Sequence, residues 1–187
     1  MAEIKNLTVR YGKNAVLKDF SAEFPEGSVT AISGRSGCGK TTLLSAVSGL
    51  LRPAHGTLSG FGTCSVLFQE DRLLPFLTAV KNLTVTTGCT ETEAKNALMQ
   101  VGFDMEDIEK TASALSGGMA RRVAIVRAIL AESDTLILDE PFKGLDDKTR
   151  GEVLRFVNAN RRGRTLLVVT HDPRDAGDLN ADRFINM

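Results

Sequence analysis

The sequence predicts an α/β fold with a mainly parallel sheet flanked by helices, a small antiparallel β region and a helical insert. Two observations carry this prediction. The runs "TLILD" and "TLLVV" are unbroken apolar stretches typical of strands buried on both faces, and the segment between them has helical spacing. Strand, crossover helix and strand in this order indicate a parallel sheet, whose ligands bind at the carboxyl ends of the strands.

The first segments of the chain alternate between apolar and polar residues, as half-buried strands do. Turns separate "EIKNLTVRY" (3–11), "AVLKDFSAEF" (15–24) and "SVTAIS" (28–33), which we therefore predict to form an antiparallel meander of three strands. The stretch 37–51 follows with helical spacing, and we expect this helix to end at Arg52-Pro53. "GTLSGFGTCSVLFQ" then indicates a return to short strands.

From residue 73 to about 110 the pattern is helical, and "ETEAKNALMQV" puts four apolar residues on one face: Ala94, Ala97, Leu98 and Val101. We expect one domain over 1–187, with an antiparallel β region over about 1–30 and a helical subdomain over about 71–115. The remainder forms the core around the parallel sheet.

Composition excludes several classes of protein. The 187 residues are 42% hydrophobic, enough for a core, and 23 basic residues balance 23 acidic ones. No global charge favours nucleic acid or an anionic membrane surface, and no apolar run approaches the roughly 18 residues that span a bilayer. We therefore expect a cytoplasmic protein without nucleic acid. Cys38, Cys64 and Cys89 lack the spacing of zinc or disulfide sites, which indicates reduced packing residues.

A phosphate-binding loop is the most specific motif. "GRSGCGKT" (34–41) satisfies G-x-x-x-x-G-K-[ST] and lies between a predicted strand and a helix, which is the context that this motif requires. Its glycines turn backbone N–H groups inward, its lysine reaches the terminal phosphates and its threonine offers a hydroxyl to Mg²⁺. We expect a nucleotide to contact Gly34, Arg35, Ser36, Gly37, Cys38, Gly39, Lys40, Thr41 and Thr42, and the family resemblance described below implies that it is ATP.

An acid pair follows the first buried run, in "LILDEP". Asp139 would be costly at the end of a buried strand unless a cation lay there, which favours Mg²⁺, and Glu140 would accept a proton from the attacking water. Gln69 and His171 also end buried strands and could orient that water or sense a γ-phosphate. Taken singly, each is more often an ordinary polar residue at a strand end.

A second anion-binding helix start is predicted within "SALSGGMARR" (113–122). Ser116 can cap the helix, and Gly117 and Gly118 let a ligand approach the bare backbone N–H groups. The arginines that follow are interpreted as mainly structural, pairing with acidic neighbours along the helix: Arg121, Arg122 and Arg127.

Taken together and in this order, the motifs resemble the ATP-binding cassette family over nearly the whole chain. The resemblance implies a P-loop NTPase fold with a RecA-like core and ATP hydrolysis. It implies that Tyr11, with Val16 beside it, stacks on adenine, although a lone tyrosine on a strand is by default a packing residue. It assigns Mg²⁺ to Thr41, Gln69 and Asp139, and catalysis to four side chains: Glu140, His171, Gln69 and Lys40.

The same resemblance implies a head-to-tail homodimer that traps two ATP molecules. Each nucleotide would lie between the phosphate loop of one copy and Ser116, Gly117 and Gly118 of the other, with Asp146 of "KGLDD" beside it. Lys143 departs from the pattern, because relatives carry serine or glycine there. We also expect no regulatory domain after "RFINM".

"FQEDRLLPFLTAVKNL" and the methionine of "LSGGM" resemble ATPase subunits of bacterial nitrate, sulfonate and taurine importers. This implies import of a small solute through separate membrane permease subunits, supplied by a solute-binding protein, with the chain peripheral on the inner face of the cell membrane. Leu74, Pro75 and Phe76 would then offer an apolar anchor to a permease helix, although the segment could also be a plain amphipathic surface.

Several alternatives stay open at this point. The chain could serve an ABC exporter, or act as a soluble non-transport cassette on nucleic acid or ribosomes, although its neutral charge gives the latter no support. A P-loop kinase of small molecules would have no use for "LSGG". A cassette that only binds ATP is disfavoured by the intact Lys40, Asp139, Glu140 and His171.

Overall fold

A computed structural model describes residues 1–187, and the chain divides into two compact units. The first, called the sheet unit here, comprises Met1–Val66, Ser133–Asp139 and Gly163–Met187. The second, called the helical unit, comprises Leu67–Glu132 and Glu140–Arg162. The subdivision expected from the sequence, with boundaries near residues 30, 71 and 115, stays a prediction.

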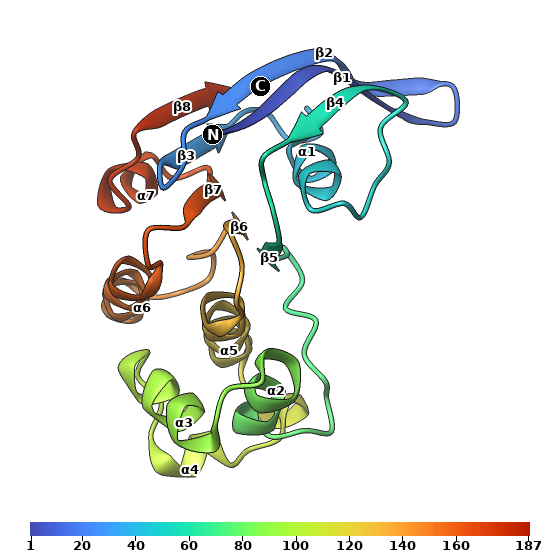
Figure 1. Ribbon diagram of the computed structural model, residues 1–187. Coiled ribbons are helices and arrows are strands. Elements are labelled where there is room, and N and C mark those ends of the chain that lie inside the picture. Colours follow the sequence, from blue (N-terminus) through green and yellow to red (C-terminus); the bar gives the residue numbers. More distant parts are fainter. The chain divides into compact units, whose positions relative to one another are not determined.

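The sheet unit contains two sheets (Figure 1). One is antiparallel, with the order β2-β1-β4, and consists of β1 (Ala2–Tyr11), β2 (Asn14–Phe24) and β4 (His55–Ser59). The other has the order β5-β6-β7-β3-β8, with β6, β7, β3 and β8 paired in parallel. Its strands are β5 (Cys64–Leu67), β6 (Thr135–Asp139), β7 (Thr165–Val169), β3 (Val29–Ser33) and β8 (Arg183–Asn186).

The predicted meander is wrong in its third strand. β3 pairs with β7 and β8 in the parallel sheet, whereas β4, from outside the region 1–30, lies beside β1. The physical reason is burial on both faces, since Val29, Thr30, Ala31 and Ile32 are all buried. The parallel pairing predicted for the two unbroken apolar runs is confirmed, because β6 and β7 are parallel neighbours, and every residue of both strands is buried.

Two helices belong to the sheet unit: α1 (Lys40–Val47) and α7 (Pro173–Asp178). α1 ends before the predicted Arg52-Pro53, because Ser48 is its C-cap and Gly49 follows with a left-handed φ of 75°. Leu43 and Leu44 of α1 pack in one core cluster with Ile32 of β3 and Ile137 of β6. This packing fixes the start of α1 at the end of β3.

The helical unit contains α2 (Ala79–Thr87), α3 (Glu91–Gln100), α4 (Met105–Ile108), a 3₁₀ turn (Ala112–Ala114), α5 (Gly117–Leu130) and α6 (Asp147–Asn160). The apolar face predicted for α3 is confirmed, since all four of its residues are buried: Ala94, Ala97, Leu98 and Val101. A capping box between Thr90 and Glu93 starts this helix. No helix in the chain combines the length and apolar character that crossing a bilayer requires.

Candidate functional site

The phosphate loop joins β3 to α1 in the sheet unit. Gly39 is the N-cap of α1 and has a φ of 110°, which side chains rarely adopt. A Cβ at Gly39 would lie 2.7 Å from Leu17 Cδ2 and 3.2 Å from Val16 Cγ1. Backbone conformation and packing therefore both require glycine here, and Val16 lies directly beside the loop.

Lys40 is the first residue of α1 and is 8% exposed. Its Nζ donates hydrogen bonds to the backbone oxygens of Gly34 at 2.8 Å and Arg35 at 2.9 Å. A buried ammonium needs such acceptors, and these hold it within the loop. The loop thus combines a cation with the free N–H groups of a helix start, which is the chemistry of a phosphate site.

Thr41 and Asp139 lie together in the sheet unit, as the predicted metal site requires. The Thr41 hydroxyl donates to Asp139 Oδ2 across 3.3 Å, and Asp139, the last residue of β6, is 5% exposed. A hydroxyl and a carboxylate are hard oxygen ligands of the kind that Mg²⁺ takes together with substrate phosphates. The donor set therefore fits this ion. Gln69, the third predicted ligand, belongs to the helical unit.

His171 follows β7, the strand next to β3, and its side chain is exposed. It lines a cavity of about 190 Å³ within the sheet unit, together with Ser33 and Thr170. The Thr170 hydroxyl donates to the buried carboxylate of Asp175, which anchors the turn that carries the histidine. Tyr11 ends β1 and is 54% exposed, so its ring is not part of the core.

In the helical unit, Ser116 is the N-cap of α5, as predicted, and its Oγ accepts a hydrogen bond from the Met119 N–H at 3.3 Å. Gly117 and Gly118 form the first turn. A Cβ at Gly117 would meet no atom within 4 Å, and one at Gly118 would make only an ordinary 3.8 Å contact with Leu145 Cδ2. The helical unit itself would accept alanine at both positions.

Glu140 opens the second segment of the helical unit with a left-handed φ of 49°, which is uncommon for a residue other than glycine. Its carboxylate forms an ion pair with Lys143 at 2.8 Å, and 16% of its side chain is exposed. Sequence reasoning singled out Lys143 only as a departure from the family pattern. Spacing alone did not reveal that its ammonium contacts the predicted general base.

Asp146 caps α6. Its carboxylate accepts hydrogen bonds from the backbone N–H of Thr149 at 3.0 Å and from the Thr149 hydroxyl at 2.7 Å. These bonds, the backbone one above all, lower the pKa of Asp146, which is thus anionic at neutral pH. The Asp146 side chain therefore caps the start of α6, and this structural role does not depend on a ligand.

The prediction that Arg121, Arg122 and Arg127 pair with acidic neighbours along the helix is wrong for most of their bonds. Most of their hydrogen bonds go to backbone carbonyl groups of other segments rather than to acidic side chains along α5. Arg122 binds the carbonyls of Val101 and Gly102, and Arg127 binds those of Asp71 and Arg72. The structural interpretation itself holds, because these bonds fasten neighbouring segments to α5.

Gln69 is exposed and lies two residues after β5. The segment that follows carries the predicted apolar anchor, and here Phe76 is 89% exposed and Leu74 is 43% exposed, with Pro75 also exposed between them. An exposed phenylalanine and leucine so close together are typical of a contact surface. They favour the predicted anchor over a plain amphipathic surface.

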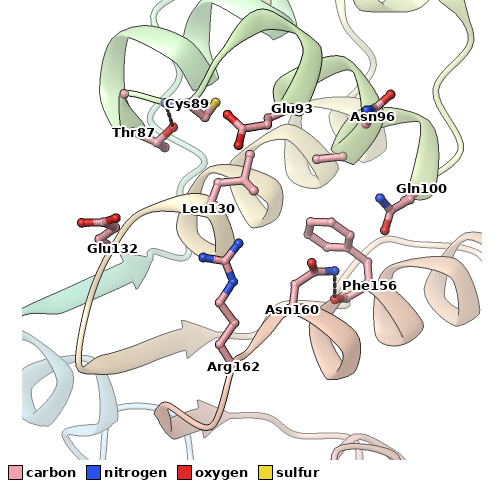
Figure 2. A pocket seen from close by; sticks show the side chains of 12 residues that line it. Thr87, Cys89, Glu93, Asn96, Gln100, Leu130, Glu132, Phe156, Asn160 and Arg162 are labelled. Carbon is pink, nitrogen blue, oxygen red and sulfur yellow. Dashed lines mark hydrogen bonds between the residues drawn. The ribbon is translucent and has the colours of Figure 1, made fainter.

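A larger cavity, of about 400 Å³, lies within the helical unit between α3 and the end of α6 (Figure 2). None of the predicted site residues lines it. Two of its polar side chains are engaged locally, since Glu93 accepts from Thr90 and Asn160 donates to the Phe156 carbonyl. This cavity is therefore separate from the predicted nucleotide site.

Comparison with known proteins agrees with these observations. The ABC transporter family matches residues 17–143. The aliphatic sulfonates import ATP-binding protein SsuB 2 of Pseudomonas aeruginosa is 38% identical over 97% of this chain and 70% of its own length. The SsuB protein of Corynebacterium glutamicum is 36% identical over 94% of this chain and 75% of its own length.

Among solved structures, the ATP-binding cassette MJ0796 in a dimeric post-hydrolysis state with ADP and Pi is similar, with a TM-score of 0.88. It is 26% identical, and the match covers 100% of this chain and 94% of that one. The predicted P-loop NTPase fold is thereby confirmed. The chain belongs to the ABC transporter family, and it is an ATP-binding cassette ATPase.

Proposed function

We propose that the chain is the ATPase subunit of an ABC importer, in which ATP hydrolysis drives uptake of a small organic solute. The observation that carries the proposal is the phosphate loop with Thr41 and Asp139 in hydrogen-bond contact beside the buried Lys40. The relatives named as aliphatic sulfonate import proteins favour import over export. Aliphatic sulfonates are accordingly the first solute class to test.

The nucleotide would be held mainly by the sheet unit. Lys40 and the N–H groups at the start of α1 bind the β- and γ-phosphates, and the exposed ring of Tyr11 stacks on adenine with Val16 in support. Thr41, Asp139 and Gln69 would hold Mg²⁺, which neutralises charge on the phosphates when it is bound.

Hydrolysis needs a group that takes a proton from water. Glu140 fits this role because its carboxylate is mostly shielded from solvent. His171, on the exposed turn after β7, senses the γ-phosphate, and Gln69 orients the attacking water. Lys40 completes the proposed catalytic set, and each of its four side chains can donate or accept a hydrogen bond.

A head-to-tail homodimer would complete each site. Ser116, Gly117 and Gly118 of one copy close on the γ-phosphate held by the other, and Asp146 fixes the neighbouring turn. The proposal is supported by the open space at the glycines, which leaves the α5 N-terminus approachable. The dimeric cassette structures among the relatives favour the same arrangement.

Membrane permease subunits would be the functional partners and would receive solute from a solute-binding protein. Phe76, Leu74 and Pro75 supply an exposed apolar anchor to which a permease helix can dock. The chain would then work on the inner face of the cell membrane as a peripheral subunit.

The experiment compares Glu140→Gln with the parental protein, and uses Glu26→Gln, at the far more exposed Glu26, as the control. We expect Glu140→Gln to lower the rate of phosphate release at least about 100-fold while ATP binding persists. Glu26→Gln should hydrolyse ATP at the parental rate. Parental turnover by Glu140→Gln would refute the assignment of the general base. Turnover that permease subunits do not stimulate would argue against the transport role.

A further inference from the structure

We infer that Arg121 is a positioning residue, which ties the segment carrying Gln69 to the segment carrying Glu140 and so holds Glu140 ready for hydrolysis. The inference deepens the proposed function and rests on the role of Glu140 there. Arg121 lies in the first half of α5 and is 6% exposed. It is the one arginine among the three near "LSGGM" that contacts both segments.

The contacts run in two directions from one guanidinium group. Towards the first segment, Nη1 donates to the carbonyl of Phe68 at 2.7 Å and that of Gln69 at 3.5 Å, and forms an ion pair with Asp71 at 3.0 Å. Towards the second, Nη2 donates to the carbonyl of Glu140 at 2.8 Å and Nε to that of Pro141 at 3.3 Å. All of these residues belong to the helical unit.

Only an arginine can make this set of bonds. Its five N–H donors lie in one rigid plane and point in fixed directions, whereas a lysine offers a single rotatable charge. A buried cation also requires compensation, which the Asp71 carboxylate and the ring of carbonyl dipoles supply. The two segments therefore cannot move apart without leaving a buried charge poorly paired.

Glu140 needs such support because of its own backbone. Its left-handed φ of 49° is unfavourable for a residue with a side chain, and it persists only where surrounding contacts hold it. The bond from Arg121 Nη2 and a backbone bond from the Lys143 N–H, at 3.2 Å, both end on the Glu140 carbonyl. Arg121 thus fixes the backbone from which the carboxylate projects.

The same group also connects the permease-facing segment to the general base. Residues 68–71 lead directly into the exposed anchor at Leu74 and Phe76. A displacement of residues 68–71 is passed to the Glu140 carbonyl through one planar side chain, so the position of the base depends on the segment that partners would contact. This gives the site a direct mechanical route for regulation.

The test compares Arg121→Gln with Arg127→Gln in steady-state ATP hydrolysis. Arg127 is the matched control because it lies on the same helix and binds the carbonyls of Asp71 and Arg72, but makes no bond to Glu140 or Pro141. We expect Arg121→Gln to lower kcat at least about tenfold, since several bonds to a charged group are lost, with KM for ATP within about twofold of the parent. Arg127→Gln should keep at least about half of the parental kcat.

Hydrogen exchange followed by mass spectrometry supplies a second readout. Arg121→Gln should speed exchange in peptides covering both 68–72 and 140–143, whereas Arg127→Gln should speed it in 68–72 alone. Arg121→Lys should behave like Arg121→Gln, because a single charge cannot reach all the acceptors. Parental kcat in Arg121→Gln or Arg121→Lys would overturn the inference, as would an equal loss in Arg127→Gln.

If Arg121→Gln does not fold, Asp71→Ala carries the test. It removes only the carboxylate that fixes one side of the guanidinium, and we expect kcat to fall severalfold with faster exchange in 140–143. Parental values in a folded Asp71→Ala protein would overturn the inference. Glu140→Gln separates the two claims. If that variant hydrolyses ATP normally, the proposed role of Glu140 as general base fails. If it is inactive while Arg121→Gln is normal, only the positioning role of Arg121 fails.

Discussion

Replacing Gly117 or Gly118 with alanine should leave the stability of the fold intact but weaken ATP-driven dimerisation. In the monomer, a Cβ at Gly117 meets nothing within 4 Å and one at Gly118 comes no closer than 3.8 Å to another atom. Both residues lie in the first turn of α5, where alanine is a better helix former. Each variant should therefore keep or raise the free energy of unfolding, by at most about 1 kcal/mol.

The same methyl group should oppose ATP-driven dimerisation, because it occupies the space through which a phosphate reaches the backbone N–H groups. Steric crowding of this size costs about 1–3 kcal/mol. At about 1.4 kcal/mol per tenfold change, dimerisation in a Glu140→Gln background should weaken by about 5- to 150-fold. Light scattering with ATP measures the dimer, and urea titration measures the free energy of unfolding.

Gly151 provides the control for this prediction. It lies within α6, and a Cβ there would also meet nothing within 4 Å, so Gly151→Ala should stabilise the fold in the same way. It should leave ATP-driven dimerisation unchanged, because no ligand is proposed there. Two results would refute the reasoning: parental dimerisation by Gly117→Ala and Gly118→Ala, or a loss of more than about 1 kcal/mol in their folding stability.

Three further predictions concern the sheet unit. Gly39→Ala should destabilise the fold by about 1–3 kcal/mol more than Gly37→Ala, because both need a positive φ but only Gly39 meets packed atoms, and equal losses in urea titration would contradict this. Thr41→Val should weaken ATP binding measured with Mg²⁺ and leave binding in EDTA unchanged; the same loss in both buffers would count against a metal ligand. The pKa of Asp134 is lowered, mainly by the Thr63 backbone N–H, so its stabilisation is fully present above the ordinary aspartate pKa of about 4 and is lost as the pH falls from there through the lowered pKa. Asp134→Asn should thus show a shallower decline of unfolding free energy on acidification than the parent, and parallel declines would exclude this role.

The fold was predictable where one local pattern decides the structure. The strands β6 and β7 have no polar alternation, and their complete burial follows from that. β3 could have been recognised by the same signal, since "VTAI" is buried throughout, but its position after two alternating segments favoured a meander. Pairing of β4 with β1 depends on contacts between residues about 50 positions apart, for which the chain carries no local signal.

The candidate site divides in the same way. The phosphate loop could be predicted because glycine, lysine and threonine stand in a strand-to-helix context, and Ser116 because N-caps have a residue preference. The contacts of Arg121 could not, since an arginine after "LSGGM" is equally compatible with solvent, an acidic neighbour or a ring of carbonyls. Long side chains reach partners that sequence spacing does not specify.

The acid pair illustrates how local structure can give neighbouring carboxylates different chemistry. Asp139 is the last residue of the strand β6 and is almost completely buried. Its carboxylate accepts a hydrogen bond from the Thr41 hydroxyl, so its surroundings suit the proposed metal ligand. At Glu140 the backbone φ is 49°, the carboxylate pairs with Lys143, and the backbone carbonyl accepts a hydrogen bond from Arg121. The two carboxylates therefore contact different partners, a hydroxyl at Asp139 and an ammonium at Glu140. These different contacts agree with the different roles proposed for the two acids, a metal ligand at Asp139 and a general base at Glu140.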